Sequence, residues 1–174
     1  TDLPFAPGRE ILAVAASELF KAHVLAGRYD AARLEEERLN RLLCRALRVP
    51  KLDVTALAGW VRSEPQAAIE KEGLVQAAAW SAFARGLLRL DGDGRPEGAA
   101  GLFDEAIDLL GAQRSLPAGG AFADRLEEAV HTARRRALQA KTDTFGTPDP
   151  GGVTQRLPEG GLLARLRHLL RGPS

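Results

Sequence analysis

Apolar residues recur at helical spacing along almost the whole chain, and proline and glycine residues stand between the periodic stretches. This pattern predicts helices joined by turns, because a half-buried strand would alternate apolar and polar positions instead. The expected helices cover residues 7–26, 28–48, 54–62, 64–90, 96–111 and 121–141. We therefore expect an all-α fold built of antiparallel helical hairpins.

Some of the expected helices have apolar faces that the spacing defines. In the first helix a broad apolar stripe, typical of a helix that packs on a core, comprises Ile11, Leu12, Ala15, Leu19, Ala22 and Leu25. In the last of these helices the residues expected to face inward are Phe122, Leu126, Ala129, Val130, Ala133 and Ala137. Helix 64–90 differs, since apolar residues between Leu74 and Leu88 cover most of its circumference. It is predicted to be the buried central helix, and it contains Trp80.

Two helix starts carry local signals. Asp53 is expected to be the N-cap of a short helix ending near Arg62, because an Asp side chain can accept a hydrogen bond from a free backbone N–H. Ser63 is expected to cap the next helix, with Pro65 in the first turn and Gln66 three residues after the cap.

Residues 83–111 predict two helices joined by a tight turn at Gly94. Ala99 and Phe103 stand four residues apart and Ala106 three further on, so these side chains share one helical face. The segment resembles a tetratricopeptide (TPR) repeat, a helix–turn–helix unit of about 34 residues with an A-x3-F element in its second helix. The resemblance implies TPR-like stacked hairpins that bind a partner in a groove. A compact helical bundle remains the alternative.

The composition bounds the class of protein. With 174 residues, 45% hydrophobic and 27% charged, the chain is expected to form one ordinary globular domain. Its formal net charge of +1 argues against a global nucleic-acid footprint. The single Cys44 excludes an internal disulfide, and its leucine neighbours predict a buried, inert thiol. Without a signal segment or a membrane-length apolar run, we expect a cytoplasmic location. Scarce Lys beside abundant Ala, Leu, Arg and Gly is typical of GC-rich bacterial genomes.

Two motifs approach metal sites without completing them. The loop at Asp91 begins like a calcium-binding EF-hand, but Arg95 and Leu102 stand where later ligands are needed. Glu128 and His131 have the Glu-x-x-His spacing of di-iron bundles, yet no second copy of that motif occurs. We therefore expect a solvated turn, an exposed Glu–His pair, no metal and no cofactor.

The composition changes after the last long helix. We divide the chain into a helical domain of residues 1–141, a Gly-, Pro- and Thr-rich linker of residues 142–161, and a short amphipathic helix and tail of residues 162–174. One face of this tethered helix carries Leu162, Leu163, Leu166, Leu169 and Leu170, and the other carries most of Arg165, Arg167, His168 and Arg171. It could dock on its own domain or on a partner. An anionic membrane is disfavoured because no interfacial aromatic is present.

The functional hypothesis is a non-enzymatic protein–protein interaction module: an adaptor, a chaperone or an assembly subunit. It would recognise a segment of another protein, or of a second copy, through a helical groove, with the C-terminal leucines and arginines as further partner-binding residues. The alternative is a small subunit of a nucleoprotein complex that contacts phosphates through Arg134, Arg135 and Arg136. The same three arginines could instead bind an acidic partner.

Overall fold

A computed structural model describes residues 7–145 of the chain. Within this range the chain forms seven α-helices and a single π-helical turn, with no strand, so the all-α expectation is confirmed. The elements are α1 (Pro7–Leu25), α2 (Tyr29–Leu47), α3 (Val54–Ser63), α4 (Pro65–Ile69), α5 (Glu72–Leu87), η1 (Leu88–Gly92), α6 (Pro96–Gln113) and α7 (Gly119–Phe145). The predicted C-terminal helix at residues 162–174 lies outside the described residues, as does most of the predicted linker.

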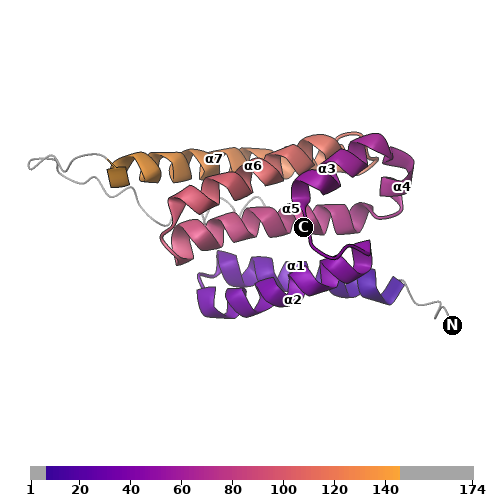
Figure 1. Ribbon diagram of the computed structural model, residues 1–174, viewed down its shortest axis with the longest axis horizontal. Helices are drawn as coiled ribbons and strands as arrows, with labels where there is room; N and C mark the ends of the chain where they lie inside the picture. The colour runs from indigo at the N-terminus through magenta and orange to yellow at the C-terminus, as the bar shows by residue number, and fades with distance from the viewer. Residues whose placement is uncertain (1–6, 146–174) are drawn as a thin grey trace, which may run out of the picture.

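Helix α5 is the centre of the fold (Figure 1). The α1–α2 hairpin packs on one side of α5, and α6 packs on the other, with α7 and α3 against α6. Most side chains of α5 are buried, from Leu74 through Trp80 to Leu87. The prediction of a buried central helix around Trp80 is therefore confirmed.

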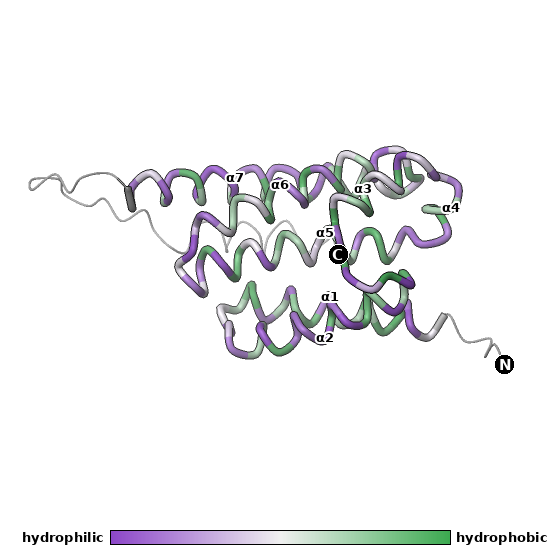
Figure 2. Tube along the Cα trace, viewed as in Figure 1, coloured by the Kyte–Doolittle hydropathy of each residue, from purple (hydrophilic) through white to green (hydrophobic). Residues whose placement is uncertain are grey.

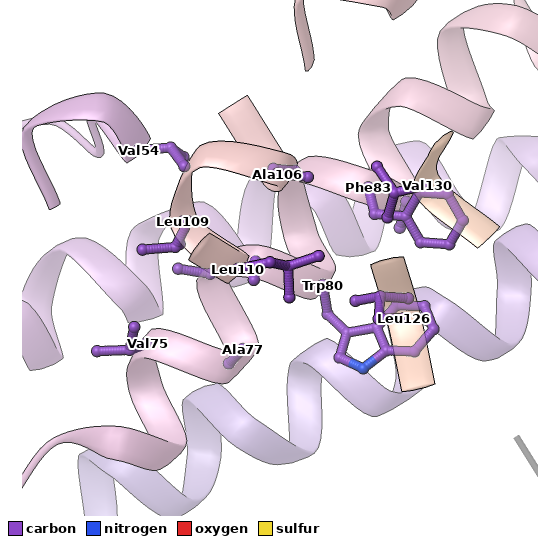
Figure 3. Packing of buried hydrophobic residues seen from close by; sticks show 14 of the residues in the cluster. Val54, Val75, Ala77, Trp80, Phe83, Ala106, Leu109, Leu110, Leu126 and Val130 are labelled. Carbon is purple, nitrogen blue, oxygen red and sulfur yellow. The ribbon is translucent and has the colours of Figure 1, made fainter. Parts of the chain in front are cut away.

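The aromatic side chains join the helices at the core. Trp80 and Phe83 of α5 have ring centroids 5.6 Å apart, and the rings of Phe83 and Phe103 are 5.9 Å apart. Leu126 and Val130 of α7 lie beside these rings (Figure 3). Every residue of α7 that was expected to face inward is buried, and in Figure 2 hydrophilic and hydrophobic turns alternate along this helix, as one buried face requires.

The seam between α5 and α6 depends on small residues. Ala99, Phe103 and Ala106 are all fully buried, which confirms that they share the inward face of α6. Gly86 of α5 lies directly against the Phe103 ring. The two helices approach closely because neither side of this contact carries a second bulky side chain.

The helix boundaries around α3 and α4 are partly as predicted. Asp53 caps α3, since its Oδ1 accepts a hydrogen bond from the N–H of Ala56 at 2.9 Å. Ser63, however, ends α3 instead of capping the next helix, and its hydroxyl donates to the carbonyl of Trp60. The expected long helix 64–90 is also wrong, because it breaks into α4 and α5 at Glu70 and Lys71.

The turn between α5 and α6 is held by ion pairs. The Asp93 carboxylate accepts hydrogen bonds from Arg33 of α2 and from Arg89, each at 2.6 Å. Both guanidinium groups hold the pKa of Asp93 below its usual range. Gly94 adopts φ +63°, so it makes the turn as expected. The Asp91 loop is thus a turn held by ion pairs, whereas a solvated turn was expected.

Helix α7 continues past Lys141, its predicted end, to Phe145. Ala137 is the last buried residue of α7 up to residue 143, and Leu138 beyond it is 40% exposed. The end of α7 therefore projects beyond the core.

Candidate partner-binding surface

The apolar stripe predicted for the first helix lies on the solvent side of α1. Leu25, the last residue of the stripe, is partly buried and packs against the core. The other five are exposed: Ile11 by 67%, Leu12 by 52% and Leu19 by 41%, together with Ala15 and Ala22. We call these five residues the outer α1 face. The side of α1 that packs inward carries Ala13, Ala16, Phe20 and Val24 instead. The expectation that the stripe packs on the core is therefore wrong for these five residues, because α1 is apolar on two opposite faces.

A groove opens between α1, α5 and α7. Its volume is about 300 Å³, and its lining residues are Val14, Ser17, Glu18, Lys21, Gly73, Gln76, Ala77, Trp80, Phe122, Arg125 and Leu126. We call it the α1–α7 groove. The most buried of its large apolar residues are Trp80, Phe122 and Leu126, which are at most 7% exposed. Its floor is therefore apolar and rigid, built from side chains that also belong to the core.

Charged groups stand at the rim of the α1–α7 groove. The ammonium group of Lys21 lies 4.7 Å from the centre of a Trp80 ring and also pairs with Glu18, one turn away on α1. On the α7 side, Arg125 is exposed and forms no ion pair with any residue between 7 and 145. The groove thus combines an apolar floor with one cation that a ligand can pair.

A second, mostly apolar pocket of about 380 Å³ lies where the end of α2 meets α3. Its lining residues are Leu47, Val49, Lys51, Leu52, Asp53, Ala56, Leu57, Trp60 and Lys71. Lys71 at its edge is engaged by Glu10 of α1 at 3.3 Å, and the Asp53 carboxylate caps α3. Lys71 and Asp53, two of the three charged residues that line this pocket, therefore already have partners inside the fold.

The three consecutive arginines of α7 point to different partners. Arg134 donates to Asp104 of α6, and Arg136 donates to Asp91 of η1 at 2.6 Å. Arg135 donates to the hydroxyl of Thr132 at 3.2 Å and forms no ion pair with a residue between 7 and 145. The structure therefore does not bring Arg134, Arg135 and Arg136 together as one unpaired basic patch.

No reactive constellation accompanies these surfaces in the described part of the chain. Cys44 is half-buried beside Arg41, Arg45 and Arg48, which corrects the expectation of a buried thiol. Glu128 and His131 are exposed, as expected. Between residues 7 and 145 no group of three or more His, Cys, Asp or Glu side chains is placed to hold a metal ion.

Two other titratable groups respond to burial. Burial raises the pKa of Glu105, and the positive charge of Arg85 lowers it in part. Burial also raises the pKa of Tyr29, and the negative charge of Asp91 raises it further. Tyr29 packs at the α5–α6 turn, where its ring faces Gly92. Neither group lines the α1–α7 groove.

The C-terminal candidates lie outside the described residues: Leu162, Leu163, Arg165, Leu166, Arg167, Leu169, Leu170 and Arg171. Comparison with protein-family models, with curated proteins and with solved structures gives no match for this chain. Among residues 7–145, no helix has both the length and the apolar character needed to cross a membrane.

The sequence predicted that several residues of the α1–α7 groove are buried, but it did not predict that they line a groove. Spacing identified Phe122 and Leu126 as inward-facing and placed Trp80 on the central helix. Nothing in the spacing indicated that Val14 and Lys21 of α1 would stand opposite α7. This proximity arises only when both helices pack on α5.

Proposed function

We propose that the chain is a non-enzymatic protein-interaction module that binds an amphipathic helical segment of another protein in the α1–α7 groove. The observation that carries the proposal is the combination of an apolar floor, made by Trp80, Phe122 and Leu126, with a cation at the rim, Arg125, that forms no ion pair with any residue between 7 and 145. We further propose that the scaffold is TPR-like, because helical hairpins of that kind present grooves for extended or helical partner segments.

The groove geometry favours a helix as the occupant. Helices α1, α5 and α7 run along the long axis of the domain, with α1 and α7 on opposite sides of α5 (Figure 1). A helix laid along them would contact three helices at once. It would present apolar residues at i, i+3, i+4 and i+7 to Trp80 and Phe122. Burial of apolar surface then contributes favourably to binding, and it must outweigh the entropy lost when the two partners associate.

Charge supplies selectivity in this scheme. Arg125 favours a partner with Asp or Glu beside its apolar stripe. The exposed ion pair itself contributes only about 0.2–1 kcal/mol, because solvent screens it. Reversing the charge at position 125, however, places a carboxylate beside the partner's Asp or Glu, and the repulsion between them weakens binding of that partner. Arg125 therefore discriminates between partners more than it adds to total affinity.

The test compares two charge reversals on one helix. Wild-type protein, Arg125→Glu and Arg135→Glu are immobilised, and proteins retained from the native cell extract are quantified. We expect one partner to be retained by wild type and by Arg135→Glu, and to drop about tenfold with Arg125→Glu, the equivalent of 1.4 kcal/mol. Equal losses for both variants would indicate unspecific charge effects, and no loss for Arg125→Glu would contradict the proposed site.

A further inference from the structure

The outer α1 face is an uncovered row of large apolar side chains. Ile11, Leu12 and Leu19 stand on one side of the helix, with the small Ala15 between them and Ala22 at the end. Leaving a contiguous apolar row in water is unfavourable, so such rows mark contact surfaces. We propose that the chain covers this face itself, with residues 162–171 docked as a short helix whose leucines pack on α1.

The size of the face favours a tethered occupant. The outer α1 face offers five residues, whereas a stable interface between free proteins uses about 20–30 residues on each side. A second copy arriving from solution would gain too little from so small a contact. A segment of the same chain needs a smaller contact area, because its covalent connection holds it at an effective concentration of about millimolar.

The segment can reach the face. Residues 146–161 span up to about 50–60 Å when extended, whereas α1 with its nineteen residues is about 28 Å long. Helix α7 ends at the same end of the domain as the α1–α2 turn (Figure 1). Phe145 therefore lies at the end of the domain toward which the half of α1 with Leu19 and Ala22 points.

The two surfaces are matched in pattern and charge. As a helix, residues 162–170 would carry five leucines on one face, and such a face could pack on the apolar row of α1, in which Ala15 is a small residue. No acidic residue follows Glu159, so the segment is purely basic through Arg165, Arg167 and Arg171. Glu18 stands at the edge of the outer α1 face with its side chain 57% exposed, and it can pair with one of these arginines.

Disulfide trapping tests the contact in the full-length chain. In a Cys44→Ser background, Ala15→Cys is combined with Leu166→Cys, and the matched control combines Leu34→Cys with Leu166→Cys. Leu34 is equally apolar and 73% exposed, but it lies on α2. A disulfide needs Cα atoms within about 7 Å, so mild oxidation reports direct contact. We expect an intrachain disulfide in the Ala15 pair and little in the Leu34 pair.

Thiol labelling gives an independent measurement. The Ala15→Cys thiol, again with Cys44→Ser, is labelled in chains with the native tail and with Leu166→Asp/Leu170→Asp. We expect labelling of the Ala15→Cys thiol to be about tenfold faster with the altered tail. The two aspartates prevent the tail from docking, although the chain still holds it near the outer α1 face, so the thiol stays accessible. Interchain disulfides would assign the face to a second copy. Equal trapping in both cysteine pairs, or equal labelling rates, would mean that the tail does not cover it. Either result overturns this inference without bearing on the α1–α7 groove.

Discussion

Gly86 of α5 and Phe103 of α6 meet so closely that a side chain at position 86 would force the Phe103 ring or one of the helices to shift. A methyl group on Gly86 would lie 2.3 Å from Phe103 Cε1, far inside van der Waals contact. The Phe103 ring is fully buried, so it cannot move aside into solvent. This contact sets how closely the central helix and α6 approach.

The first prediction concerns this contact. Gly86→Ala should lower the free energy of unfolding by about 1–3 kcal/mol, because the added methyl overpacks the seam. Gly101→Ala on the exposed side of α6 should raise it by about 0.5–1 kcal/mol, because nothing lies near that position and alanine favours helix. Urea denaturation at equilibrium measures both. A stabilising Gly86→Ala would show that the helices are not in this close contact.

The second prediction removes the ring itself. Phe103→Ala should cost about 3–5 kcal/mol, since it leaves a cavity between α5 and α6. The same denaturation experiment measures this loss. A cost below about 1 kcal/mol would mean that the face shared by Ala99, Phe103 and Ala106 does not form the seam.

The third prediction is a pH dependence. Arg33 and Arg89 lower the pKa of Asp93 below its ordinary value of 3.8, so the native state favours the ionised carboxylate. The stabilisation is fully present above the unfolded pKa and disappears as the pH falls through the lower folded pKa. The difference in free energy of unfolding between wild type and Asp93→Asn should therefore be constant near neutral pH and shrink below about pH 4. Asp30→Asn, which removes only a solvent-exposed pair with Arg33, is the control. A difference that does not change with pH would contradict the ion-pair account of the turn.

The fourth prediction concerns the end of the folded domain. Ending the chain after Phe145 should leave the helical domain folded and lower its free energy of unfolding by about 1–1.5 kcal/mol, because the chain loses a docked tail whose tenfold protection corresponds to about 1.4 kcal/mol, whereas no residue of α7 between 138 and 143 is buried. The unfolding midpoint and its denaturant dependence measure this. A truncated chain that fails to fold would make residues 146–174 an integral part of the core.

Local sequence signals located most helices. Gly27 and Gly94 adopt φ +69° and +63°, so the turns that they mark are required by backbone sterics. Asp53 caps α3 because its side chain acts within one helical turn. Such features depend on neighbours in sequence, so the sequence alone reveals them.

Features set by packing were not predictable. Neither Glu70 nor Lys71 is a residue that disfavours helix, so the break between α4 and α5 has no local signal. It accompanies the burial of Ala68 and the ion pair between Lys71 and Glu10. Periodicity identified an apolar stripe on α1, but it could not decide which of two apolar faces would meet α5. Periodicity also could not predict the ion pair between Arg136 and Asp91, because these residues are far apart in the sequence.

The most direct test of the proposed function places a photo-crosslinking side chain at Gln76, which lines the α1–α7 groove. A matched probe at Arg135 on the exposed side of α7 is the control. After irradiation in native extract, we expect the Gln76 probe to link to one segment of one partner protein, to lose that product when Arg125→Glu is added, and the Arg135 probe to give no such product. A folded protein whose Gln76 probe yields no defined product, or the same products as the Arg135 probe, would contradict the account.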